Sequence, residues 1–154
     1  MQQSTDMDAA WMEEAIKEAE KAPVHGDVPI GCVIVKDGEV IARAHNRREA
    51  DTDPTAHAEV LALRQAAEKI GAWRLSGCTV VVTCEPCAMC SGALVLARVD
   101  RLVFGCDDPK AGASRSLYRI PEDDRLNHQV AIYGGILAET CGNLWRAFFT
   151  KQRP

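Results

Sequence analysis

Apolar residues recur in the first third of the chain at two different spacings. Residues 7–22 carry them three or four positions apart, with acidic side chains on the opposite side, which predicts an amphipathic surface helix. Residues 30–46 contain two apolar runs on either side of Asp37-Gly38. This pattern predicts a β-hairpin closed by a two-residue turn of type I′.

The middle of the chain carries clear signals for the start and end of a helix. Residues 53–71 have apolar positions at the helical period. Asp53 can cap this helix, Pro54 suits its first position, and Gly71 suits its end. The short apolar run over residues 78–83 then predicts a strand that is buried on both faces.

The rest of the chain continues the alternation of helices and strands. The predicted elements are a helix from Glu85-Pro86 to residue 99, a strand over 101–105, a polar loop over 106–116, a strand over 128–134 and a helix over 137–152. Alternation of this kind after a hairpin predicts an α/β sandwich built around a mixed sheet.

The composition is that of a globular protein. The 154 residues, 47% hydrophobic and 26% charged, predict a single domain over 1–154 with its core over about 8–150. The N-terminal segment lacks the basic start, apolar run and cleavage site of a signal peptide. No apolar stretch reaches the ~18 to 20 residues of a membrane span. We therefore expect a cytoplasmic protein that does not enter a membrane.

The net charge of −4 is unevenly distributed. Residues 1–60 carry 13 acidic and 6 basic side chains, whereas residues 61–154 carry 9 and 12. This difference fits two solvated faces of opposite sign, and it also fits a locally basic surface that meets phosphates. It excludes a uniformly basic nucleic-acid binder.

Cysteine is abundant and concentrated in the segment TCEPCAMC over residues 83–90. An odd number of cysteines without a secretion signal argues against a disulfide framework and favours metal binding or buried thiols. Taken alone, this segment could also be a redox pair or a three-cysteine metal or iron–sulfur fragment. The seven cysteines are Cys32, Cys78, Cys84, Cys87, Cys90, Cys106 and Cys141.

Three residues at two predicted helix starts form a candidate metal site. Cys87 and Cys90 share one helix face in the first turn, where the helix dipole favours thiolates. His57 lies near the start of the other helix and adds a third ligand. One His and two Cys leave a fourth tetrahedral position for water, which is the composition of a catalytic zinc site.

Glu59, two residues after His57, is then the candidate proton carrier. Positions i and i+2 do not share a helix face, so the two side chains would approach the metal-bound water from different directions. Cys84 remains a buried thiol at the end of a strand, since a fourth protein ligand would displace the water. A lone histidine is more often structural, but the paired pattern H-x-E and P-C-x-x-C is the signature of zinc-dependent nucleobase deaminases.

The sequence resembles the bacterial tRNA-specific adenosine deaminases (the TadA family) of the cytidine deaminase superfamily from about Trp11 to Phe149. The matching stretches are DVPIGCVIV, HNR, DPTAHAEVLALR, WRL, EPCAMCSGAL, RLVFGCDDPKAGA, LNHQV and GIL. The resemblance implies a three-layer α/β/α sandwich around a five-stranded mixed sheet, usually as a homodimer. It also implies hydrolytic conversion of adenosine to inosine at the wobble position of the anticodon loop of an arginine tRNA.

The same resemblance assigns roles to individual residues. His57, Cys87 and Cys90 would bind one Zn²⁺ per subunit, and Glu59 would shuttle the proton. Asn46, in the stretch HNR, matches an asparagine that contacts the flipped-out base, although an asparagine at this place is otherwise a common strand-end or turn residue.

Three other residues carry expectations. Arg115 stands where family members usually have glycine, and it could add a phosphate contact or alter the substrate. Phe148 and Phe149 are expected to be core or dimer anchors rather than base-stacking residues.

Two rival functions remain open. The first is a deaminase of free adenine, guanine or cytosine, or of their nucleosides, with the same zinc mechanism. The second is a non-catalytic zinc-binding subunit that docks RNA or a partner. Glu59 argues against the second, because a purely structural metal site has no use for a proton carrier.

Overall fold

The computed structural model describes residues 6–152, so the ends of the predicted domain, residues 1–5 and 153–154, lie outside the described residues. Within this part of the chain, five strands form one mixed sheet in the order β2-β1-β3-β4-β5. The pairs β2–β1 and β1–β3 are antiparallel, and β3–β4 and β4–β5 are parallel. The strands are β1 (Gly31–Lys36), β2 (Glu39–His45), β3 (Cys78–Cys84), β4 (Arg101–Cys106) and β5 (Ala131–Tyr133).

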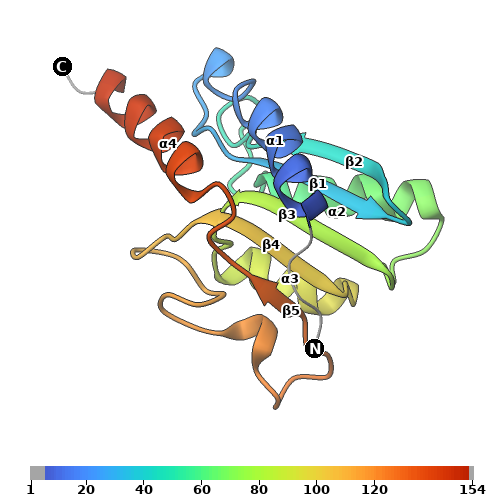
Figure 1. The fold of residues 1–154 in the computed structure, drawn as a ribbon. Coiled ribbons are helices and arrows are strands. Elements are labelled where there is room, and N and C mark those ends of the chain that lie inside the picture. The colour runs from blue at the N-terminus through green and yellow to red at the C-terminus, as the bar shows by residue number, and fades with distance from the viewer. Residues whose placement is uncertain (1–5, 153–154) are drawn as a thin grey trace.

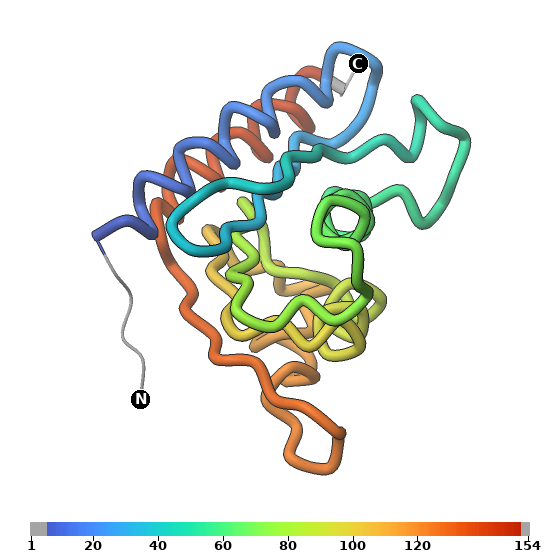
Figure 2. Tube along the Cα trace, turned by 90° about the vertical axis from the view of Figure 1, so that its right-hand side faces the viewer, coloured from blue at the N-terminus to red at the C-terminus, as the bar shows by residue number. Residues whose placement is uncertain are grey.

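Helices cover both faces of the sheet (Figure 1). The two that share the first face, α1 and α4, run side by side in Figures 1 and 2, and α2 and α3 cover the second face. This arrangement confirms the predicted α/β/α sandwich. The helices are α1 (Asp6–Ala19), α2 (Ala58–Ile70), α3 (Ala88–Ala97) and α4 (Ala138–Gln152), with short 3-10 turns η1 (Pro23–His25) and η2 (Ile120–Glu122).

Strand β3 lies at the centre of the sheet and divides the core into two clusters. Every residue of β3 is buried, as its continuous apolar pattern predicts. Alternate side chains point to opposite faces of a strand. Val80 and Val82 therefore pack with α2 and α3, whereas Val81 packs with α1.

The predicted hairpin is β1–β2. Asp37 and Gly38 both have positive φ, 52° and 77°, which is the backbone of a type I′ turn. At the other end of β1, Gly31 lets α1 lie directly on the strand, because a Cβ there would be 2.0 Å from the carbonyl oxygen of Ala15.

The start of α2 differs from the prediction. The helix begins at Ala58 with His57 as its N-cap residue, so the predicted start at Asp53 and Pro54 is wrong. The Asp53 carboxylate instead accepts hydrogen bonds from the backbone N–H and the hydroxyl of Thr55, which closes a separate turn. The predicted end is confirmed, since Gly71 adopts the left-handed conformation after the last turn.

The other predicted elements are found, three of them with shorter bounds. The first helix, expected over 7–22, ends at Ala19. The helix expected from Glu85-Pro86 starts at Ala88, and the strand expected over 128–134 is limited to Ala131–Tyr133. Among residues 6–152, no helix has both the length and the apolar character needed to cross a membrane.

Candidate metal centre and active site

Two helix N-termini meet beside the end of β3 and bring the predicted ligands together. His57 is the N-cap residue of α2 and Cys87 is the N-cap residue of α3, both with extended backbone. Cys90 lies in the first turn of α3. The two helix starts therefore place one nitrogen and two sulfur donors around a common point.

The distances among these donors match the edges of a tetrahedral zinc site. His57 Nδ1 lies 3.6 Å from Cys87 Sγ and 3.5 Å from Cys90 Sγ. The ligand atoms of all three residues lie within 4.8 Å of one another. Zn–N and Zn–S bonds of about 2.0 and 2.3 Å in a tetrahedron give an N···S edge of about 3.5 Å. The donor set and its spacing therefore fit a zinc ion.

The electrostatics of the cluster favour a ligating thiolate. Hydrogen bonds with Cys90 and His57 lower the pKa of Cys87 to about 3. The hydrogen bond with Cys87 in turn raises the pKa of His57, and the nearby Arg48 charge opposes that rise. The low pKa favours the thiolate form of Cys87 at neutral pH, which is the form that binds a metal cation.

Glu59 is buried beside the ligand cluster. Its side chain is 3% exposed and lines the same cavity as His57 and Cys87. Burial raises the pKa of Glu59 to about 7. A carboxyl group with a pKa near neutrality can both accept and donate a proton, which is the property required of a proton carrier.

Asn46 supplies the cap of α2 from a distance in sequence. Its Oδ1 accepts a hydrogen bond of 2.8 Å from the backbone N–H of Ala58, the residue between His57 and Glu59. Asn46 is 3% exposed and lines the cavity. Because the oxygen is used by the helix, the amide nitrogen is the group that remains to donate into the cavity.

The cavity beside the cluster has a volume of about 210 Å³ and is closed on one side by α4. Trp145 and Phe149 from α4 line it, with their ring centroids 4.8 Å apart. Phe149 is 38% exposed and lines the cavity, so the expectation of a core anchor is wrong, whereas the alternative of a dimer anchor stays a prediction. Trp145 was not singled out from the sequence. The spacing of four residues between Trp145 and Phe149 on a helix was the available signal.

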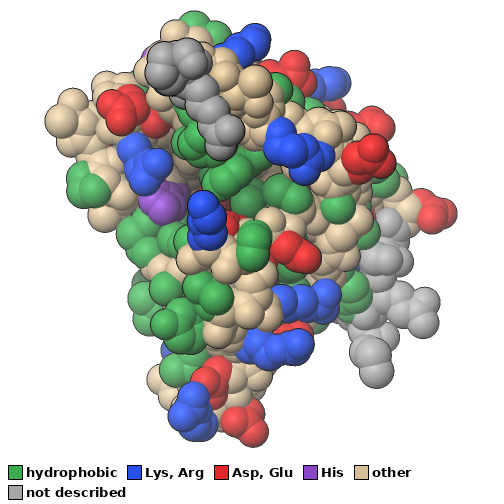
Figure 3. Space-filling model, turned by 90° about the vertical axis from the view of Figure 1, so that its left-hand side faces the viewer, with side chains coloured by type: hydrophobic (Ala, Val, Ile, Leu, Met, Phe, Trp, Pro, Cys, Tyr) green, Lys and Arg blue, Asp and Glu red, His purple; other side chains and the backbone are tan. Residues whose placement is uncertain are grey.

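Charged and apolar side chains are mixed around this end of the molecule. Figure 3 looks onto the end of the sheet where β3 and β4 terminate. Lys and Arg side chains are spread over this face among hydrophobic and acidic ones. The surface is therefore not uniformly basic, in agreement with the composition.

The loop after β4 contributes Asp108 and Ala111 to the lining of the cavity and is held by one buried carboxylate. Glu85, 3% exposed, accepts hydrogen bonds from the backbone N–H groups of Asp108, Ser114, Arg115 and Ser116 at 2.8–3.2 Å. The hydroxyl of Ser116 donates a fifth bond. These bonds outweigh the effect of burial and lower the pKa of Glu85, so the group is an anion with a saturated set of donors.

Arg115 has a structural contact in this loop. Its guanidinium donates a hydrogen bond of 2.9 Å to the carbonyl oxygen of Ile132 in β5, so this side chain joins the loop to the edge of the sheet. Among the described residues, Arg115 is not one of those with a positive φ. The backbone here therefore does not require glycine.

Cys84 is the last residue of β3 and is buried, as predicted. All seven cysteines of the sequence lie within the described residues, and all are free thiols. Cys84 is not part of the group of possible metal ligands that includes His57, Cys87 and Cys90.

Comparison with known proteins identifies a family. The sequence matches the model of the MafB19-like deaminases over residues 6–153. A tRNA-specific adenosine deaminase of Bacillus subtilis (strain 168) is 51% identical over 146 residues, which cover 95% of this chain and 91% of that protein. A tRNA-specific adenosine deaminase of Haemophilus influenzae is 41% identical over 150 residues, or 97% of this chain and 87% of that protein.

Solved structures agree. One from studies of A-to-I editing by tRNA:A34 deaminases at the wobble position of transfer RNA has a TM-score of 0.85 at 41% identity, covering 88% of this chain and 98% of that one. A guanine deaminase from Nitrosomonas europaea shares the fold at 21% identity, with a TM-score of 0.82 over 97% of this chain and 87% of that one. The chain belongs to the family of tRNA-specific adenosine deaminases.

Proposed function

We propose that this protein is a zinc-dependent hydrolase that deaminates adenosine to inosine at the wobble position of a tRNA anticodon loop. The observation that carries the proposal is the convergence of His57, Cys87 and Cys90 beside the buried Glu59 in one cavity. A site of three protein donors with an adjacent carboxyl group is suited to hydrolysis rather than to a purely structural role. We further propose that residues 1–154 act as one deaminase domain in the cytoplasm, where tRNA is found.

His57, Cys87 and Cys90 would hold the zinc ion. When bound, zinc is a Lewis acid that makes water a nucleophile at neutral pH. Their donor types and their spacing of 3.5–3.6 Å support this assignment. The low pKa of Cys87 supports it as well, because a thiol must lose its proton to bind a metal.

Glu59 would carry the protons of the reaction. It takes a proton from the attacking water and delivers it to N1 of adenine, which makes C6 more electrophilic. It would then pass the proton of the hydroxyl added at C6 to the 6-amino group, so that the C6–N bond breaks, ammonia leaves and the C6 oxygen becomes the carbonyl of inosine. Burial supports this role, since a carboxyl group with a pKa of about 7 can alternate between its two forms with little change in free energy.

Asn46 would orient the base by donating a hydrogen bond from its amide nitrogen. Trp145 and Phe149 offer aromatic surfaces beside the same cavity, which suits stacking with unpaired bases of an RNA loop. The volume of about 210 Å³ suits a single base and not a folded RNA. The target nucleotide would therefore enter the cavity flipped out of the loop, while its neighbours remain outside.

Asn46→Asp should separate base binding from helix capping. An aspartate can still accept the Ala58 N–H, and the helix N-terminus tolerates its charge, but it has no amide donor. We expect kcat/KM to fall at least about tenfold with a small change in Tm, because a buried hydrogen bond is lost. Asn46→Ala should also lower the free energy of unfolding by about 1 kcal/mol, because the cap of the helix is lost. Both variants are measured together. Near-normal activity of Asn46→Asp would show that the Asn46 amide nitrogen does not donate a hydrogen bond needed for deamination.

The function is tested with an anticodon stem-loop of an arginine tRNA and, separately, with free adenosine, guanine and cytosine. Mass spectrometry of digested products shows which substrate loses an amino group. Inosine confined to the wobble position supports the proposal. Turnover of a free base or nucleoside with an unchanged stem-loop would assign the same site to small-molecule deamination instead.

A second copy of this chain is the proposed partner. A shallow apolar hollow of about 290 Å³ lies on the outer side of α2 and α3. Trp73 and Leu96 border it and are 63% and 71% exposed, which is unusual for large apolar side chains. We propose that this surface forms a homodimer interface, in which each residue is used twice because the interface is symmetric.

Leu96→Glu should dissociate this dimer. Because both copies lose an apolar contact and gain a buried charge, we expect the dimer Kd to rise at least about a hundredfold. Light scattering after size exclusion measures the mass at several protein concentrations. Leu126→Glu, at another exposed leucine outside this hollow, is the matched control and should leave the mass unchanged. A Leu96→Glu protein with the wild-type mass would place the interface elsewhere.

A further inference from the structure

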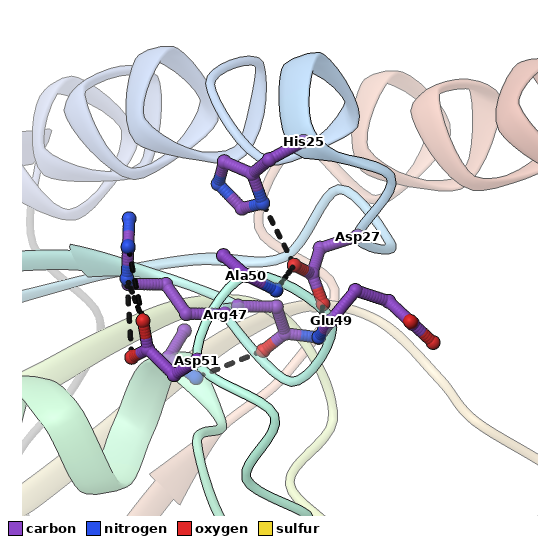
Figure 4. Close-up of polar contacts among 8 residues, drawn as sticks. His25, Asp27, Arg47, Glu49, Ala50 and Asp51 are labelled. Carbon is purple, nitrogen blue, oxygen red and sulfur yellow. Dashed lines mark hydrogen bonds and ion pairs between the residues drawn. The ribbon is translucent and has the colours of Figure 1, made fainter.

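A buried carboxylate outside the catalytic cluster holds the loop between β2 and α2. Asp27 is 2% exposed and accepts hydrogen bonds from the backbone N–H groups of Glu49 (2.9 Å) and Ala50 (3.2 Å). Nδ1 of His25 lies 2.7 Å from Oδ2 of the same carboxylate. Figure 4 shows these contacts converging on Asp27 from the loop and from η1. The loop is therefore attached to a buried group rather than left to move freely.

Contacts within the loop fix it further. Arg47 Nε lies 3.0 and 3.2 Å from the two carboxylate oxygens of Asp51, and the Asp51 backbone N–H donates to the carbonyl oxygen of Arg47 (Figure 4). The carbonyl of Arg48 accepts a hydrogen bond of 3.1 Å from the backbone N–H of Asp53. The positive charge of Arg47 is thus paired with Asp51 inside the loop. The backbone around Arg48 is fixed by the hydrogen bond from Asp53 to the Arg48 carbonyl and by the one from the next residue, Glu49, to Asp27.

The guanidinium of Arg48 has no such internal use. Within residues 6–152, the Arg48 side chain makes no ion pair or hydrogen bond. It lines the active-site cavity together with His57 and Glu59, and it also lines the adjoining surface hollow formed by Glu49, Thr52, Asp53 and Pro54. An exposed guanidinium at the mouth of a cavity is a strong donor for a phosphate group, which it can bind through two parallel hydrogen bonds.

Resting on the proposed function, we propose that Arg48 binds a phosphodiester next to the target adenosine, and that Asp27 is the positioning residue that holds Arg48 at the cavity mouth. A free base carries no phosphate and a nucleoside carries none either. Arg48 is therefore a specificity-determining residue, since it stabilises the binding of a polynucleotide and contributes nothing to the binding of the small substrates.

The test uses a seven-nucleotide single-stranded RNA with one adenosine at its centre. In a second set of RNAs, each phosphate in turn is replaced by a methylphosphonate, which removes the charge and keeps the linkage. Fluorescence anisotropy gives the Kd for zinc-loaded Glu59→Ala protein, in which the RNA stays unconverted. Turnover of the same RNAs is measured with the zinc-loaded protein that retains Glu59.

Arg48→Gln should weaken binding of the natural RNA about tenfold, as expected for loss of a charge-assisted hydrogen bond. The slope of log Kd against log salt should fall by about 0.7, the value for one phosphate contact on a single strand. At one linkage next to the adenosine, replacement by methylphosphonate should weaken RNA binding by the protein that retains Arg48. The same replacement should not weaken RNA binding by Arg48→Gln any further. Arg125→Gln removes the same charge from an exposed loop and should change Kd less than twofold.

Asp27→Asn tests the positioning role. The substitution makes the net charge less negative, which by itself would strengthen RNA binding. Weaker binding would therefore show that Arg48 is no longer held at the cavity mouth. We expect faster hydrogen exchange at the amides of Glu49 and Ala50 and a smaller methylphosphonate effect at the same linkage. Adding Asp27→Asn to Arg48→Gln should weaken binding no further.

Two results would overturn the proposal. If each methylphosphonate weakened binding by equal factors in the protein that retains Arg48 and in the Arg48→Gln variant, Arg48 would not contact a phosphate. If Asp27→Asn left the linkage effect unchanged, Asp27 would not position Arg48. Absence of inosine from the natural RNA and the stem-loop would instead count against the deaminase function, and it is distinguishable because the binding measurements do not depend on turnover.

Discussion

Glu59→Ala should leave zinc bound and stop deamination. Its carboxyl group lies in the cavity but does not belong to the group of ligand atoms formed by His57, Cys87 and Cys90. General acid–base catalysis by one side chain contributes about 10² to 10⁴ in rate, and here one residue serves more than one proton transfer. We therefore expect kcat to fall at least about a thousandfold. Metal analysis and inosine formation from the stem-loop measure the two properties in one sample.

Two further variants sharpen this test. Glu59→Gln keeps the shape of the side chain and cannot carry a proton, so it should be as inactive as Glu59→Ala. Cys87→Ala should lose both metal and activity, because it removes the thiolate ligand. Turnover of Glu59→Ala within tenfold of the unsubstituted protein would refute the mechanism, and loss of its zinc would make Glu59 a metal ligand.

Glu85→Gln should destabilise the protein and release the loop over residues 107–116. The carboxylate accepts five hydrogen bonds, four of them from backbone N–H groups, whereas an amide has one oxygen and presents an NH₂ group to the remaining donors. Leaving buried donors without an acceptor costs about 1–3 kcal/mol each. We expect unfolding free energy to fall by about 3 kcal/mol, measured by urea denaturation.

Hydrogen exchange locates this effect. The amides of Asp108, Ser114, Arg115 and Ser116 should exchange faster in Glu85→Gln, while those of β3 remain protected until global unfolding. Glu122→Gln is a suitable control, since Glu122 forms an ion pair with Arg119 at the surface. A stability change in Glu85→Gln no larger than in this control would contradict the role of Glu85.

The predicted ligands could be found from sequence because each motif is short and lies at a helix start. Cys87 and Cys90 are three residues apart, and a helix places such residues on one face whatever the rest of the chain does. The convergence of His57 with them depends on a parallel β–α arrangement that the alternating apolar pattern indicates. Local spacing, together with the paired H-x-E and P-C-x-x-C signature, therefore pointed to the three ligands.

The start of α2 could not be predicted from local signals because its cap is a tertiary contact. Asp53 and Pro54 fit the rules for a helix start, yet the Asp53 carboxylate is occupied by Thr55. The Ala58 N–H is satisfied by Asn46, which lies at the end of β2, twelve positions earlier. Only the packing of β2 against α2 brings that oxygen to the helix.

Residues around the cavity mouth were missed for a similar reason. The sequence singled out Phe149 only as a core or dimer anchor and did not single out Trp145, because the periodic pattern of α4 does not show that a cavity lies beside this helix. Likewise, nothing in the segment DDPKAGASRS indicates that its backbone N–H groups donate hydrogen bonds to Glu85, since that carboxylate belongs to an earlier part of the chain. Loop walls of this kind are built from contacts between distant segments.

The double use of Asn46 bears on how this protein could be redesigned. Its oxygen accepts the Ala58 N–H at the start of the helix that carries Glu59, and the same residue lines the cavity, so on the proposed function we expect a change at this position to alter base preference and catalytic geometry together. In a mutational library aimed at new bases, we expect most substitutions at Asn46 to be inactive. Trp145 and Phe149 line the same cavity, cap no helix and have no part in the proposed phosphate contact, so they are the positions at which such a library should be diversified.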